Sequence, residues 1–118
     1  MPDVKELDQQ LNQQILAGDI LNAFEKFYAA DVVMQENTDA PKVGKDVNRE
    51  AEKQFLGSVE AFHGAKILAG AVNGDVSFSE WEYDLTMKGA PRMTMNQVAV
   101  RRWKNGQIVH ERFYYKGH

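Results

Sequence analysis

The chain has no cysteine among its 118 residues, so disulfides, thiol nucleophiles and cysteine-ligated metal sites are all excluded. Its three histidines stand at positions 63, 110 and 118, without the i, i+4 or His-x-His spacing of zinc sites. We therefore expect no bound metal, and we expect no cofactor.

Long apolar runs and an excess of positive charge are also lacking. No apolar run approaches the roughly 18 residues that a membrane-spanning helix needs, and the first residues do not have the pattern of a signal peptide. The formal net charge is −3, which disfavours binding to polyanions. The one basic run, residues 101–104, is expected at a strand end, where its side chains alternate between faces. We expect a cytoplasmic protein that binds neither nucleic acid nor membrane.

Three segments in the first half have apolar residues at helical spacing. They cover about residues 3–17, closed by Gly18, then residues 20–28, capped by Asp19, and a third segment from Asp46 to His63. The third helix is predicted to turn one apolar stripe inward, made of Val47, Ala51, Phe55, Val59 and Phe62.

From Lys66 onward the sequence is typical of strands. Turn residues at 73–74, 88–91 and 105–106 predict three hairpins and hence four antiparallel strands. Residues 75–87 alternate between an acidic face and an aromatic face, and the aromatic one should face inward. The sequence thus predicts one α+β domain over residues 1–118, in which a curved antiparallel sheet wraps around three helices.

The most informative single residue is Glu36, which ends the run from Phe27 where a helix gives way to a short apolar strand. A carboxylate at such a place can be desolvated, and desolvation raises a carboxyl pKa toward values useful for proton transfer. Glu36 is therefore a candidate general base. The alternative is a solvated loop carboxylate beside Asn37 and Asp39.

Three motifs, in this order and spacing, give the chain a family resemblance. They are residues 17–19 (Ala-Gly-Asp), residues 27–33 (Phe-Tyr-Ala-Ala-Asp-Val-Val), and residues 103–109 followed by Glu111-Arg112. The chain resembles SnoaL-like proteins of the nuclear transport factor two-like superfamily over nearly its whole length. These share a cone-shaped α+β roll with polyketide cyclases, ketosteroid isomerases and limonene epoxide hydrolases, and the fold hosts enzymes, binders and scaffolds.

The resemblance places Glu36 where ketosteroid isomerases keep the aspartate that shuttles a proton beside a carbonyl. Their helix-one tyrosine would fall near Leu11 and their protonated aspartate near Ala99 or Val100, so both oxyanion donors are missing. The last-strand carboxylate of epoxide hydrolases corresponds to Phe113. Neither reaction by its familiar route is expected.

The expected pocket is lined by the inner face of the cone, with Glu36 at its mouth or floor. Its ligand-binding residues are predicted to be Tyr28, Trp81, Tyr83, Gln97, Phe113 and Tyr115. Glu111 is a weaker catalytic candidate and could equally pair with Arg101. A two-residue turn at 105–106 would put Glu111 opposite Val100, and a three-residue turn with a bulge would put it opposite Ala99. The resemblance favours Val109, Glu111, Phe113 and Tyr115 facing inward.

Two functions compete. The first is an enzyme of isomerase, cyclase or hydrolyase type that acts on a small apolar carbonyl compound through Glu36. The second is a non-catalytic binder of a small hydrophobic molecule. A dimeric scaffold is a third. The outer sheet face is more apolar than a solvated surface requires, at Val76, Phe78, Val98 and Val100. With the family resemblance, this predicts a homodimer through the sheet.

Overall fold

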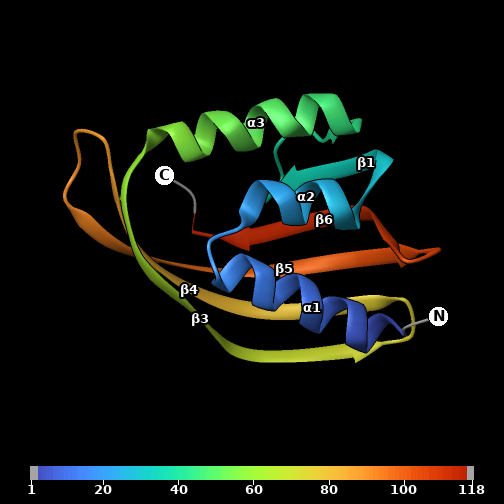
Figure 1. Cartoon of the computed structure of the whole chain (residues 1–118). Helices are drawn as coiled ribbons and strands as arrows, with labels where there is room; N and C mark the ends of the chain where they lie inside the picture. The colour runs from blue at the N-terminus through green and yellow to red at the C-terminus, as the bar shows by residue number, and fades with distance from the viewer. Residues whose placement is uncertain (1–2, 117–118) are drawn as a thin grey trace.

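A computed structural model describes residues 3–116, in which three helices lie on one side of a curved sheet (Figure 1). The helices are α1 (Val4–Leu16), α2 (Ile20–Phe27) and α3 (Lys45–Ser58), and the strands are β1 (Tyr28–Glu36), β2 (Lys42–Val43), β3 (Val59–Asn73), β4 (Val76–Met87), β5 (Arg92–Lys104) and β6 (Gln107–Tyr115). The predicted α+β class, with a curved sheet around three helices, is confirmed.

The sheet has the strand order β2-β1-β6-β5-β4-β3. The three predicted hairpins connect β3 to β4, β4 to β5 and β5 to β6, and each of these pairs is antiparallel. The strand that follows α2 was predicted only as a short apolar segment, and it lies parallel to β6, so the sheet is mixed rather than antiparallel throughout. This pairing brings Glu36 level with Phe113.

The first two helices begin and end close to the predicted residues. Asp3 caps α1 by accepting the amide of Glu6 at 2.9 Å. Gly18 follows with a φ of 85°, which glycine adopts without steric cost. The core between these helices and the sheet contains Leu11, Phe24, Phe27, Val32, Trp103 and Ile108.

The third helix departs from its prediction in both length and orientation. It ends at Ser58, because the chain from Val59 pairs with β4 and extends the sheet instead. Val47, predicted to face inward, is 53% exposed, whereas Asn48 is buried. The Asn48 amide donates to the carbonyls of Lys42 and Gly44 at 3.0 and 2.8 Å. These bonds hold Asn48 inward, so the prediction that Val47 faces inward is wrong, and the inward face of α3 is turned toward Asn48 by part of a helical turn.

The register of β5 and β6 also differs from both alternatives considered. The turn has two residues, Asn105 and Gly106, with Lys104 opposite Gln107, but an irregularity after Trp103 and Ile108 shifts the pairing. Glu111 therefore lies opposite Arg101, not opposite Val100 or Ala99. Because the extra residue is Val109, Ile108 is the one that enters the core, and Val109 is half-buried. The predicted inward orientation of Glu111 is confirmed by its full burial.

Register shifts along β3, at three places between Val59 and Ala69, accompany the bend of the sheet. The far ends of β3, β4 and β5 curl upward beside the C-terminal end of α3 (Figure 1). The Lys88 amide, just after the end of β4, donates to the carbonyl of Ser58, the last residue of α3, at 2.9 Å. This hydrogen bond joins the curled end of the sheet to the helix. Within residues 3–116, no helix combines the length and the apolar composition needed to cross a membrane.

Candidate ligand-binding site on the concave face

The concave face of the sheet is sealed at one end and accessible at the other. Along β5, the inward positions 103, 101 and 99 are buried, Gln97 and Met95 are half-buried, and Met93 is exposed. Along β6, Ile108 and Glu111 are fully buried, while Phe113 and Tyr115 are half-buried. The side chains of this face therefore pass from core to partly open surface along the strands.

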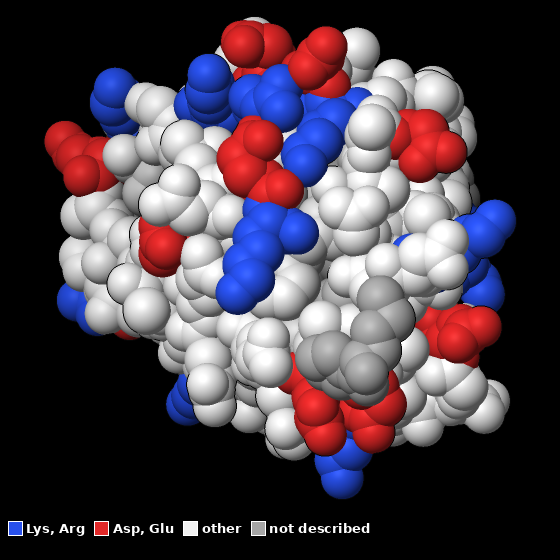
Figure 2. Space-filling view, turned by 45° about the vertical axis from the view of Figure 1, so that its right-hand side comes forward, with Lys and Arg blue, Asp and Glu red and all other residues white. Residues whose placement is uncertain are grey.

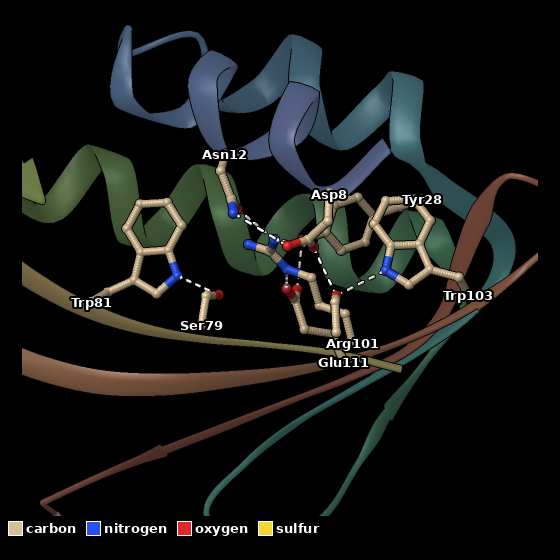
Figure 3. Close-up of polar contacts among 9 residues, drawn as sticks. Asp8, Asn12, Tyr28, Ser79, Trp81, Arg101, Trp103 and Glu111 are labelled. Atoms are coloured by element: carbon tan, nitrogen blue, oxygen red, sulfur yellow. Dashed lines mark hydrogen bonds and ion pairs between the residues drawn. The ribbon is translucent and has the colours of Figure 1, made fainter. Parts of the chain in front are cut away.

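Arg101 is the centre of the sealed end (Figure 3). Its Nε donates to Glu111 Oε2 at 2.7 Å, and its Nη1 donates to Asp8 Oδ1 at 2.9 Å and to Asn12 Oδ1 at 2.6 Å. Both carboxylates are buried with it. The pairing of Arg101 with Glu111, which the sequence left open, is confirmed.

Tyr28 completes the coordination of Glu111. Its hydroxyl donates to Glu111 Oε1 at 2.6 Å, so both carboxylate oxygens are engaged. Burial, and then the charge of Glu111, raises the pKa of Tyr28 well above that of an ordinary tyrosine. This geometry makes Tyr28 and Glu111 members of a buried polar network, and it gives more weight to the structural role of Glu111 than to the catalytic one.

Two tryptophans are fixed by serine hydroxyls in the same region. Trp103 Nε1 donates to Ser77 Oγ at 2.9 Å, and Ser77 in turn donates to Asp8 Oδ1 at 2.7 Å. Trp81 Nε1 donates to Ser79 Oγ at 2.8 Å. Trp81 has no exposed surface, so in this chain it forms the floor of the open part rather than a surface free for a ligand.

Tyr83 and Gln97 lie where the face begins to open. The Tyr83 ring stacks on Trp81, with 5.5 Å between ring centroids and 4° between planes. Burial raises the pKa of Tyr83, an effect that Arg101 partly offsets and that Glu111 and Glu52 reinforce. Gln97 is opposite both Trp81 and Tyr115. Both side chains carry hydrogen-bonding groups, and their ligand-binding role stays a prediction.

Glu36 lies at the rim and is exposed, so the expected desolvation of this carboxyl group is wrong for the isolated chain. The β1 strand ends here, and Asn37 turns away with a φ of 50°. Tyr115 is beside Glu36: burial raises the pKa of the Tyr115 phenol, and the carboxylate raises it further. Glu36, Phe113 and Tyr115 are therefore neighbours, as predicted for one side of the site, and the catalytic role of Glu36 stays a prediction.

Glu52 is a site residue that the sequence analysis missed. It is half-buried on α3, and desolvation raises its pKa to about 7, with further contributions from the negative charges of Glu111 and Glu36. The missing signal was Asn48, one helical turn earlier: once Asn48 faces inward, Glu52 must do so too. Asp8 and Asn12 were missed for a related reason. They form an i, i+4 polar pair next to the apolar stripe of α1, and the sequence pattern alone predicts that such a pair is exposed to solvent. Only the contact with the buried Arg101 shows that they face inward.

Elsewhere, the surface carries mixed charges and two hollows. Figure 2 shows acidic and basic side chains interspersed on the face in view. At the surface, Arg49 pairs with Glu25 and with Asp46. A hollow of about 530 Å³ beside the start of α3 is lined by Val43 and Val47 together with the charged side chains of Lys45, Asp46 and Arg49. A smaller one, of about 220 Å³, lies at Phe78 and Val98 on the sheet. Within the described range, no group of three or more His, Asp and Glu side chains is arranged to hold a metal ion.

The chain matches the SnoaL-like domain family over residues 5–115. It is similar to a SnoaL-like protein from Mesorhizobium loti whose suggested activity is that of a polyketide cyclase, with 30% identity, a TM-score of 0.87, and coverage of 98% of this chain and 100% of the other. No curated protein matches the chain at a significant level.

More distant structures share the fold alone. An NTF2-like protein of unknown function from Burkholderia pseudomallei is 15% identical, with a TM-score of 0.84 over 98% of this chain and 92% of that one. An epoxide hydrolase from M. tuberculosis, similar to limonene epoxide hydrolase, is 17% identical, with a TM-score of 0.76 over 96% and 82%. The family match covers nearly all of the helices and strands described above, and the chain therefore belongs to the SnoaL-like domain family.

Proposed function

We propose that the open part of the concave face binds a small, largely apolar molecule bearing a carbonyl or similar hydrogen-bond acceptor. The observation that carries this proposal is the change along β5 and β6 from sealed to half-buried inward side chains. Where a face built for packing stays partly uncovered and combines rings with a few polar groups, a ligand is the expected occupant.

The chemistry available there is acid–base chemistry. Carboxyl groups at the opening can move a proton beside a carbonyl, which would suit isomerisation, cyclisation or hydration. Glu36 is the group that the resemblance nominates for this role. The alternative is a binder that holds the same molecule without transforming it, and a scaffold with a vestigial site ranks behind both.

Neighbouring tyrosines on opposite faces of β6 provide a matched test. Tyr115 is on the concave face and half-buried, whereas Tyr114 is 43% exposed and opposite Val98 on the convex face. With 2-acetylnaphthalene as a neutral ketone probe, Tyr115→Ala should weaken binding about fivefold, as expected for the loss of one ring contact. Tyr114→Ala should leave the affinity unchanged. The proposal fails if the probe does not bind, or if only Tyr114→Ala weakens it.

We also propose that the convex face pairs with a second copy of the chain. Phe78, Val98 and Tyr114 are all exposed there, and Phe78 lies opposite Val100, so the apolar residues are contiguous across three strands. A two-fold contact would cover these residues on both copies at once. The concave face would remain free in such a dimer.

A further inference from the structure

We propose that Glu52, rather than Glu36, is the acid group of the concave site, and that it donates a hydrogen bond to the acceptor oxygen of a neutral, apolar ligand. This inference rests on the proposed function and deepens it. It names the residue that meets the polar end of the ligand and the class of ligand that fits.

The first step is the orientation of α3. Asn48, Glu52 and Phe55 are spaced i, i+4 and i+7, so they share one face of the helix. Asn48 is buried and bonded to the carbonyls of Lys42 and Gly44, which fixes that face toward the sheet. Glu52 therefore points to the concave face at the level where Tyr83 and Tyr28 feel its charge.

The second step concerns the partners of the Glu52 carboxyl group. Among residues 3–116 neither a hydrogen bond nor an ion pair engages it, in contrast to Glu111 and Asp8, whose oxygens are occupied. It is not sealed either, because the one side-chain atom in this range that is both sealed and unpartnered is His110 Nδ1. A half-buried, reachable carboxyl group without a partner is suited to an incoming acceptor.

The third step is charge. Glu36 and Glu111 both act on Glu52 as negative neighbours, and the guanidinium of Arg101 is already shared by Asp8 and Glu111. Burial together with these charges holds the pKa of Glu52 at about 7, so the protonated form is substantially populated near neutral pH. A protonated acid can donate to a carbonyl, whereas an anionic ligand would meet uncompensated negative charge.

The fourth step is the apolar side of the opening. Phe62 and Met93 both pair with Leu85, which is buried, so all three face the concave side, yet Phe62 and Met93 are each 41% exposed. The Phe62 ring lies 6.4 Å from that of Tyr83, and Phe55 is 42% exposed on α3. These rings and the flexible thioether form a lining against which the body of a ligand can lie.

The experiment compares two neutral probes that differ in one acceptor, 2-acetylnaphthalene and 2-ethylnaphthalene. Their Kd values are measured by fluorescence titration between pH 5.5 and 8.5 for the wild type, Glu52→Gln, Glu36→Gln and Glu50→Gln. Glu50 is exposed and two residues away on the same helix, which makes it the matched control. The ratio of the two affinities isolates the contribution of the ketone oxygen.

We expect the preference of the wild type for the ketone to fall about fivefold as pH rises through 7, the discrimination that one hydrogen bond gives. Glu52→Gln should remove this pH dependence, whereas Glu36→Gln and Glu50→Gln should keep it. A flat ratio in the wild type, a fall that persists in Glu52→Gln, or a fall removed by Glu36→Gln would overturn the inference while leaving the binding site in place. Failure of both probes to bind would overturn the proposed function and this inference with it.

Discussion

The hydroxyl of Tyr28, the first residue of β1, lies 2.6 Å from Oε1 of Glu111, which is 83 positions later in the sequence on β6. This bond joins the two strands that pair in parallel and links the helical half of the chain to the end of the sheet. It also leaves Glu111 with a donor on each oxygen, because Arg101 donates to Oε2 at 2.7 Å.

Tyr28→Phe removes that donor without changing the volume of the side chain. We expect it to lower the free energy of unfolding by about 2 kcal/mol, the cost of losing a buried hydrogen bond to a charged group. Urea denaturation at pH 7 measures the change. Tyr114→Phe, at an exposed tyrosine, is the control and should stay within about 0.5 kcal/mol of the wild type. Equal stabilities for the two variants would show that the bond to Glu111 contributes nothing.

Glu52→Gln should make the protein more stable at high pH. The pKa of Glu52 is raised from 4.5 to about 7 on folding, so the folded state holds this proton more tightly than the unfolded chain does. The wild type therefore loses stability relative to the variant as pH rises from about 4.5 to 7, and the difference levels off above that range. Between low and high pH, the unfolding free energy of the wild type should fall relative to that of Glu52→Gln by up to about 3 kcal/mol.

Thermal or urea unfolding at pH 4.5, 6 and 8 measures this difference. Glu50→Gln, at the exposed glutamate nearby on α3, should show no comparable trend. The difference in unfolding free energy between Glu52→Gln and the wild type could instead be the same at pH 4.5 and at pH 8. Glu52 would then titrate alike in the folded and unfolded chain. The environment inferred for it would then be wrong.

The convex face should control association. Val98→Lys places a charge at the centre of the apolar residues shared by β4, β5 and β6, where burial against a second copy would cost several kcal/mol. We expect sedimentation equilibrium to show a dimer for the wild type and a monomer for the variant. The variant should keep its affinity for 2-acetylnaphthalene. A wild type that is monomeric at every concentration tested would dismiss the dimer.

The architecture was largely predictable because local signals agree with the final structure. Gly18, Asn105 and Gly106 each occupy left-handed conformations that their sequence context anticipates. The strand alternation that put Trp81 and Tyr83 on one face is also preserved. In these places the pattern and the packing point the same way.

The site was less predictable, because three of its features are set by specific hydrogen bonds and by strand pairing rather than by the pattern of apolar residues. Asn48 overrides the apolar stripe of α3 through backbone carbonyls, and that rotation brings Glu52 inward. The single extra residue at Val109 places Glu111, rather than His110, opposite Arg101. The pairing of β1 with β6 decides that Glu36 ends at the rim and is exposed. Neither periodicity nor composition reports such contacts.

The most direct test of the whole account is the position of a bound neutral ketone. Amide and methyl chemical shifts of the labelled protein can be followed during titration with 2-acetylnaphthalene at pH 6. We predict that the perturbed residues are those of the concave opening, Glu52, Phe62, Tyr83, Gln97 and Tyr115. Perturbations confined to Phe78, Val98 and Tyr114 on the opposite face would contradict the account, because the ligand would then occupy the convex surface.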